Sequence, residues 1–155
     1  MKTFRFTLES VATLRQSREQ VATGKYAEAL LALAEAMQKL EAVEHELALG
    51  QREYKRSLLG GTTTSRVAQH EFYCANVQRK REHLVAGVKE ARAALERALQ
   101  AMLQARRDCE GVEKLREKQV AVHNRELMRA EQKETDEMAG RQLASGLNWK
   151  NNQYD

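Results

Sequence analysis

The sequence is most informative in what it lacks. None of its 155 residues is proline, and aromatic residues make up only 5%. Proline is the strongest helix breaker, so its absence allows helices to run for many turns. With so few aromatics and 31% charged residues, the composition is typical of long helices and not of a globular core. No apolar run approaches the roughly 20 residues that span a membrane, and MKTFRFTLES lacks a signal-peptide stretch. We therefore expect an all-α, cytoplasmic protein.

Residue groups that carry out chemistry are also missing. Cys74 and Cys109 are too few and too far apart for a CxxC metal or redox unit, so we expect buried thiols. The four histidines are dispersed, without the spacing of a metal site. Gly60-Gly61 is not followed by the Lys-Ser/Thr of a phosphate-binding loop. We expect no cofactor, no metal and no enzymatic activity.

What the sequence does contain is a pair of heptad patterns on either side of that glycine pair. The first follows Tyr26, Leu30, Leu33, Met37, Leu40, Glu44, Leu47, Gln51, Tyr54 and Leu58. The second follows Cys74, Val77, Arg81, Leu84, Val88, Ala91, Leu95, Ala98, Met102, Ala105, Cys109 and Val112. If the chain folds back at the glycines, facing residue numbers total 124 or 125, and Glu44 faces Arg81. The pattern predicts two helices packed as an antiparallel coiled-coil hairpin.

The boundaries follow from capping signals and helix propensity. We predict a single domain over 1–155, with a helix at 8–59, a turn at 60–65, a helix at 66–141 and a disordered tail at 142–155. The apolar pattern changes phase around Arg18, Ala22 and Tyr26, which predicts a stutter there. Beyond about residue 117 of the second helix, the first helix has no residues left to pair with it. The second helix should therefore extend several turns past its partner.

Charge is concentrated on the second helix. The formal net charge is +4, and residues 79–107 hold eight Lys or Arg against three acids. Such a stripe suits nucleic acid, acidic lipid or an acidic protein surface, but a solvated helix face is the simpler interpretation. No aromatics interleave these charges and no nucleic-acid-binding motif is present, so nucleic acid is not an expected partner.

Two terminal patterns resemble a known family. The first is Phe4-x-Phe6-x-Leu8-x-x-Val11-x-x-Leu14-Arg15. The second is Leu115-Arg116-Glu117-Lys118-Gln119 followed by Glu131-Gln132-Lys133 and Asp136-Glu137-x-Ala139-x-Arg141. Together with Tyr54, Phe72 and His83 around the hairpin turn, they resemble the FliJ family, the stalk proteins of flagellar type III export. The resemblance covers nearly the whole chain.

The resemblance implies a fold similar to the coiled coil of the rotary ATPase gamma subunit. It implies binding to the hexameric export ATPase FliI, promotion of its ring assembly, contact with the export gate protein FlhA, and escort of export chaperones. The membrane would be reached only indirectly, through the export gate at the cytoplasmic face of the inner membrane. The ATPase-contacting residues implied are Phe4, Phe6, Leu8, Leu115, Gln119, Gln132, Lys133, Asp136, Glu137 and Arg141. The gate-contacting residues implied are Leu47, Tyr54, Phe72 and His83.

Three other interpretations remain open. One is the equivalent stalk of an injectisome, which would work in the same way within a different machine. Another is a generic coiled-coil scaffold or tether, marked by self-association into a four-helix assembly. The third is a basic coiled coil that associates with nucleic acid, marked by binding to random duplex with a steep salt dependence.

Overall fold

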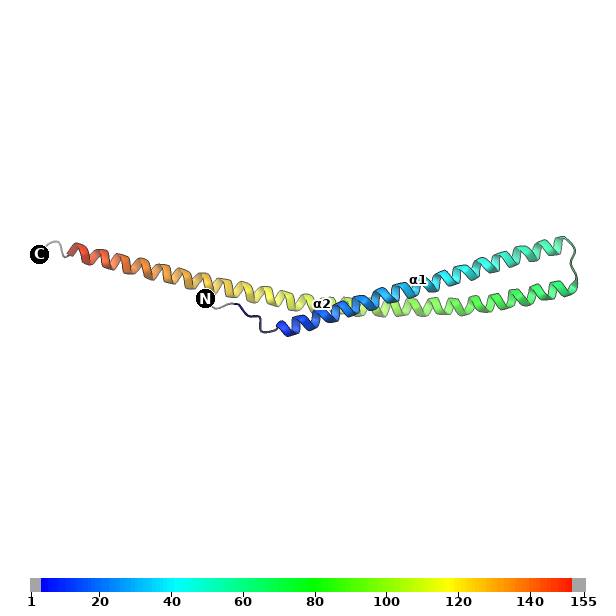
Figure 1. Cartoon of the computed structure of the whole chain (residues 1–155), viewed down its shortest axis with the longest axis horizontal. Helices are drawn as coiled ribbons and strands as arrows, with labels where there is room; N and C mark the ends of the chain where they lie inside the picture. The colour runs from blue at the N-terminus through cyan, green and yellow to red at the C-terminus, as the bar shows by residue number, and fades with distance from the viewer. Residues whose placement is uncertain (1–3, 152–155) are drawn as a thin grey trace. The chain divides into compact units, whose positions relative to one another are not determined.

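The computed structural model describes residues 4–151 of the chain, with side chains described for residues 4–144. It contains two long helices, α1 (Glu9–Leu59) and α2 (Thr64–Asn151), and no strand among these residues. Figure 1 shows both helices and the short connection between them. The chain divides into two compact units: Gln16–Arg107, and Met1–Arg15 together with Asp108–Asp155. The single domain predicted over 1–155 stays a prediction, and each unit is described separately below.

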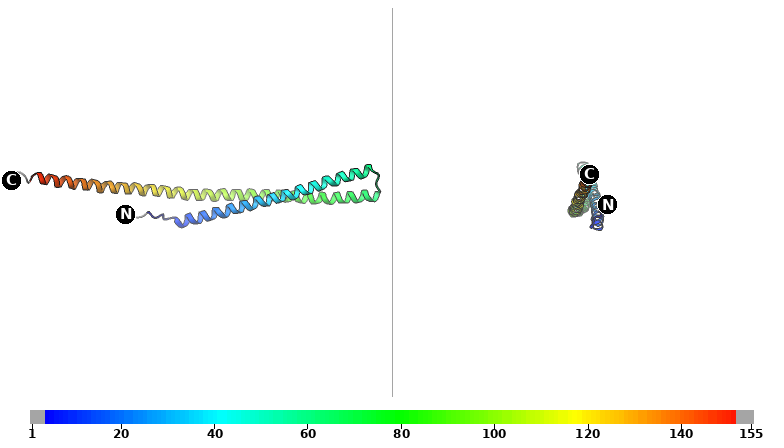
Figure 2. Two further views of the ribbon diagram at one scale, coloured as in Figure 1. Left: turned by 45° about the horizontal axis from the view of Figure 1, so that its top comes forward. Right: turned by 90° about the vertical axis from the view of Figure 1, so that its left-hand side faces the viewer.

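In the unit Gln16–Arg107, α1 and α2 pack side by side in opposite directions, as the views in Figures 1 and 2 agree. Glu44 and Arg81 form the predicted ion pair, with the Arg81 Nε atom 3.2 Å from a Glu44 carboxylate oxygen. Glu19 lies 4.0 Å from Arg106, and the Tyr54 and His70 rings are 5.7 Å apart. The two residue numbers of each pair total 124 or 125. The predicted antiparallel register is therefore confirmed.

The helix connection is shorter than predicted. Gly60 donates its amide to the Arg56 carbonyl oxygen at 3.1 Å, and Gly61 has a φ of +77°, which only glycine adopts without strain. α2 then begins at Thr64, because the carbonyl of Thr63 accepts from Arg66 and Val67 and its hydroxyl lies 3.4 Å from the Arg66 amide. Thr63 thus caps α2, whose first residue, Thr64, lies two residues before the helix start predicted at 66.

The inward face of α1 corrects part of the heptad prediction. The predicted positions 26, 33, 40, 47 and 54 do lie at the interface, but the intervening series is displaced by one residue. The half-buried or buried residues between them are small: Ala29, Ala36, Val43, Gly50 and Ser57. Of the residues predicted there, Leu30 is 48% exposed, Met37 47% and Leu58 49%.

The displacement has a packing reason. The register total of 124 places Leu33 opposite Ala91 and Ala29 opposite Leu95, so at these two layers a larger side chain lies opposite a smaller one. Apolar character alone could not distinguish position 29 from position 30. The inward spacing also runs without interruption through Glu19, Ala22 and Tyr26 in this unit, so the predicted stutter is wrong.

In the other unit, the N-terminal segment and the start of α1 pack on α2. Phe6 is 6% exposed and Cys109 7%, which makes them the most buried side chains described in this unit. Arg15 and Asp108 form an ion pair at 2.5 Å, and Glu9 lies 3.7 Å from Arg116. From Met128 to Ala144 every described side chain of α2 is exposed. The predicted overhang of the second helix is therefore present in this unit.

α2 is also longer than predicted. It continues to Asn151, whereas the sequence placed the helix end at Arg141 and a disordered tail at 142–155. No proline interrupts this stretch, and Gly146 alone costs a helix only about 1 kcal/mol, so no strong stop signal precedes Asn151. The last part of the predicted tail, 152–155, lies outside the described residues.

Candidate protein-interaction sites

The exposed end of α2 carries five of the predicted ATPase-contacting residues. They are Gln132, Lys133, Asp136, Glu137 and Arg141, and all of them are exposed. The apolar side chains among them are exposed too, with Met128 at 70%, Met138 at 65% and Leu143 at 69%. The described part of this stretch buries none of its side chains, so it leaves both charged and apolar side chains exposed, as a protein interaction surface would.

A second group of predicted residues meets where the N-terminal segment packs on α2. The Phe4 ring lies 5.5 Å from the His123 ring, and the Arg116 guanidinium lies 5.9 Å from the centre of the Phe6 ring. A guanidinium at that distance from a ring is weakly attracted by its π electrons. A groove of about 520 Å³ borders this contact, lined by Phe4, Arg5, Lys118, Gln119, Val122, His123 and Glu126. We name this group the N-terminal cluster.

The predicted contact residues in the N-terminal cluster differ in how deeply they are buried. Phe6 is buried, so its side chain anchors the N-terminal segment to α2. Phe4, Leu8 and Gln119 are half-buried, and Leu115 is 39% exposed. The sequence prediction missed His123, which contacts Phe4. A register total of 124 or 125 places residues 120 and 121 opposite Phe4, so the sequence carried no signal for this contact. The binding roles of all these residues stay predictions.

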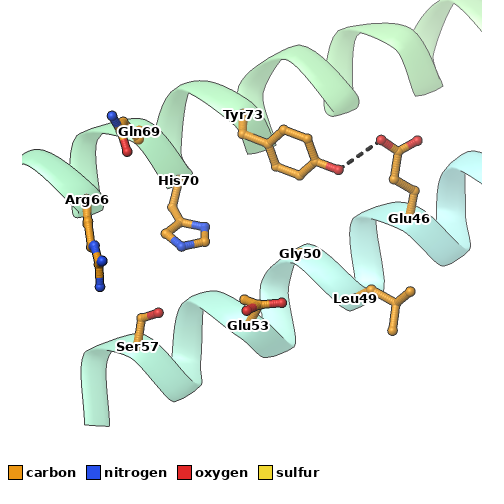
Figure 3. Close-up of a pocket in the computed structure, with 9 residues that line it drawn as sticks. All are labelled: Glu46, Leu49, Gly50, Glu53, Ser57, Arg66, Gln69, His70 and Tyr73. Carbon is orange, nitrogen blue, oxygen red and sulfur yellow. Dashed lines mark hydrogen bonds between the residues drawn. The ribbon is translucent and has the colours of Figure 1, made fainter. Parts of the chain in front are cut away.

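A third site lies near the turn in the unit Gln16–Arg107. Figure 3 shows a groove between the facing surfaces of α1 and α2, with a volume of about 640 Å³. It exists because the inward α1 residues here are small: Gly50 and Ser57 fill little of the space between the helices. The other lining residues are Glu46, Leu49, Glu53, Arg66, Gln69, His70 and Tyr73. We name this the turn-proximal groove.

Tyr73 is the central side chain of the turn-proximal groove. Its ring lies so close to α1 that a Cβ atom on Gly50 would be 3.1 Å from the Tyr73 Cε1 atom. The Tyr73 hydroxyl donates a hydrogen bond to Glu46 Oε1 at 2.8 Å, as Figure 3 shows. That bond to the carboxylate, together with partial desolvation and the negative charge of Glu46, raises the pKa of Tyr73 above its ordinary value.

The predicted gate-contacting residues occupy two kinds of position. Leu47 and Tyr54 are half-buried in the interface between the helices, and Tyr54 contacts His70. Phe72, by contrast, is 69% exposed, and His83 is exposed as well. The predicted gate-contacting set leaves out Glu46, His70 and Tyr73, which line the groove. Tyr73 carried a signal in its place beside Phe72, whereas the groove itself depends on Gly50.

We also searched the described residues for a metal site, a membrane-spanning stretch and unpaired basic charge. No group of three or more His, Cys, Asp or Glu among them could hold a metal ion. In the described part of the chain, neither helix has a stretch apolar enough to cross a membrane. On the basic stretch of α2, Arg97 pairs with Glu90 at 3.2 Å and Arg81 pairs with Glu44 at 3.2 Å. Part of its charge is therefore already balanced by neighbouring carboxylates.

Two antiparallel helices with an aromatic groove near the turn and an exposed helical end define a coiled-coil hairpin suited to contacts with other proteins. Its fold is similar to the solved structure of a putative YscO homolog from Chlamydia trachomatis, with a TM-score of 0.68 and 24% sequence identity. That match covers 96% of this chain and 99% of the other.

The sequence identifies the family. The family profile described as flagellar FliJ protein matches residues 4–147, and the chain belongs to this family. The resemblance seen in the terminal motifs is thus confirmed. The family places the chain among the stalk components of type III protein export, which are structural proteins and not enzymes. A search of curated proteins finds no match to the chain.

Proposed function

We propose that this chain is a central stalk of the export machinery, with one of its ends bound to the hexameric export ATPase FliI. The exposed end of α2 supports this most directly. From Met128 to Ala144 all side chains are exposed, and they include the charged block Lys133, Asp136, Glu137 and Arg141. A helix with this much unburied surface gains stability when a ring-shaped partner surrounds it. A single rod cannot contact six equivalent ATPase subunits in the same way. It would therefore favour ring assembly and bias which interface between two subunits closes.

The turn-proximal groove and the nearby exposed Phe72 support a second contact, with the export gate protein FlhA. Exposed aromatic side chains beside a groove are typical of protein interaction surfaces. Contact with the gate would hold the protein at the cytoplasmic face of the inner membrane without any membrane segment of its own. Escort of export chaperones is the third part of this proposal, and it rests on family membership.

The test is the ATP hydrolysis rate and oligomeric state of FliI from the same organism, with and without this protein. We expect stimulation together with ring formation, and loss of both when the chain is truncated at Gln119. The matched variant D136A/E137A should weaken the effect while leaving the hairpin's melting unchanged, because both residues are exposed. No stimulation and no co-migration with FliI across a salt series would leave a plain scaffold as the better account.

The shared fold with a putative YscO homolog supports a second candidate, a stalk of an injectisome. The same assay separates the two candidates when it is run with the flagellar ATPase and an injectisome ATPase in parallel. Stimulation restricted to the injectisome enzyme would favour this second candidate.

A further inference from the structure

Basic side chains gather where the two helices of the unit Gln16–Arg107 join, at the turn that Figure 1 shows. Residues 52–66 hold four Lys or Arg and one acid, Glu53. The basic residues are Arg52, Lys55, Arg56 and Arg66, and all four are exposed. None of them forms an ion pair with another described residue. The hairpin therefore leaves most of the positive charge at its turn unbalanced.

Three of these basic residues surround an exposed leucine. Leu59 is the last residue of α1 and is 91% exposed, the highest value among the large apolar residues described. Arg56, Lys55 and Arg52 precede Leu59 by three, four and seven residues. This spacing places their side chains next to Leu59 on one face of the helix, and that face points away from α2. We name Arg52, Lys55, Arg56 and Leu59 the turn face.

The acids near the turn face do not neutralise it. Glu53 lies three residues before Arg56 and lines the turn-proximal groove, whereas Glu71 lies on α2. Neither forms an ion pair with another described residue. With both acids counted, residues 52–71 hold four basic residues against two acids, a net charge of +2. Glu44 and Glu46, the next acids along α1, pair with basic residues of α2.

The stability of the hairpin does not account for the turn face. A basic residue in the last turn of a helix, here Arg56, interacts favourably with the helix dipole. This interaction explains neither Arg52 nor Lys55, which precede the last turn. It also does not explain why a leucine stands almost fully exposed beside the glycines of the turn. An exposed leucine bordered by unpaired basic side chains is typical of a surface that binds a partner.

We propose that the turn face binds the surface of a membrane that contains anionic lipids. Leu59 would enter the boundary between headgroups and acyl chains, while the long side chains of Arg52, Lys55 and Arg56 reach the lipid phosphates. The negative surface of such a membrane attracts a cluster of this charge. Binding through one leucine and a few charges is reversible, and it is separate from the contact proposed with the export gate.

A lipid surface fits the turn face better than an acidic protein does. Contacts between proteins are commonly centred on aromatic side chains, and no aromatic residue belongs to the turn face. Tyr54, the one aromatic residue within 52–66, is half-buried between the helices. Leu59 projects beside Gly60 and Gly61, which have no side chains to extend an apolar contact. A bilayer accepts such a single protruding leucine without a preformed pocket.

The electrostatic part of the proposal is tested with the full chain and lipid vesicles that contain no protein, so the result does not depend on binding to FliI or FlhA. Co-sedimentation is measured with phosphatidylcholine vesicles and with vesicles in which about a third of the lipid is phosphatidylglycerol. We expect binding to the anionic vesicles only, and weaker binding as salt is added. R52Q/R56Q should weaken binding roughly thirtyfold. R79Q/K89Q removes the same charge from exposed positions of α2 and should have little effect.

Insertion of Leu59 is tested with a tryptophan at that position. In a W149F background, which removes the one native tryptophan, the fluorescence of L59W should be quenched by brominated acyl chains. L31W is the matched control, because Leu31 is 66% exposed on the same helix but far from the turn. Its fluorescence should not be quenched, and circular dichroism checks that each variant stays helical.

Three results would refute the proposal. The first is an equal loss of vesicle binding in R52Q/R56Q and R79Q/K89Q, which would show general attraction of the basic chain. The second is L59W fluorescence that brominated lipid leaves unchanged. The third is no binding to anionic vesicles together with binding of an acidic helical peptide that R52Q/R56Q abolishes, because the turn face would then bind a protein.

Discussion

Replacing Gly50 with alanine tests how closely Tyr73 packs against α1. Glycine inside a helix is about 1 kcal/mol less favourable than alanine, so an alanine in open space should stabilise the hairpin by about that amount. At Gly50 the added Cβ would lie 3.1 Å from Tyr73 Cε1, closer than most such contacts. The Tyr73 ring must therefore move, and this movement offsets part of the gain. We expect G50A to raise the free energy of unfolding by less than about 0.5 kcal/mol.

Gly24 provides the matched control within the same unit and the same helix. A Cβ atom added at Gly24 would meet nothing within 4 Å. G24A should therefore show the full gain, about 1 kcal/mol or about 3 °C in the melting temperature of a chain of this size. Thermal and urea unfolding followed by circular dichroism at the helical band would measure both variants.

A double variant assigns the difference to the correct contact. In a Y73A background nothing remains at 3.1 Å, so G50A should then stabilise as much as G24A does. If G50A alone stabilises the wild-type chain as fully as G24A, Tyr73 does not lie against Gly50 and the packing argument is wrong. If the two alanines still differ in the Y73A background, another neighbour of Gly50 is responsible.

Two further predictions concern single contacts. F6A should destabilise the packing of the N-terminal segment on α2 by about 3 kcal/mol, because Phe6 is buried, whereas F72A should have little effect because Phe72 is exposed. Faster amide hydrogen exchange in F6A, confined to residues 108–123, would confirm this loss of packing. Unchanged exchange in F6A would contradict it. E46Q should lower the pKa of Tyr73 toward 10.0, since the hydrogen bond to Glu46 is the main cause of the raised value. The stabilisation from this bond is present below the ordinary tyrosine pKa and is lost as the pH rises through the raised one, so tyrosinate absorbance in E46Q should develop at lower pH than in the wild type.

The fold could be predicted from the sequence because a coiled coil is specified by local spacing. The antiparallel register followed from apolar positions and from the Glu44–Arg81 pair, which the structure contains at 3.2 Å. The choice between Ala29 and Leu30 for the interface could not be predicted in the same way. It depends on how large and small side chains alternate across two helices, and spacing along one helix does not contain that information.

The candidate sites were predictable to different degrees. The exposed end of α2 was predicted by counting which residues remained after pairing, whereas Asp136 and Glu137 were named as contact residues from the resemblance to the FliJ family, and their binding role stays a prediction. The turn-proximal groove was not predicted, because it results from the absence of side-chain atoms at Gly50 together with the ring orientation of Tyr73. A glycine in a helical pattern indicates only lower helix propensity until the residue that faces it is known.

The register is constant along the unit Gln16–Arg107. Its two helices can therefore be shortened or lengthened together without a change in which residues face each other. Removing residues 30–36 from α1 and 89–95 from α2 would take one heptad from each helix at matching positions. Glu44 would still face Arg81, and Glu19 would still face Arg106, but the second pair would lie about 10 Å nearer the turn. Insertions and deletions that occur in such matched heptads would therefore alter the span of the hairpin while every remaining contact between its helices stayed in place.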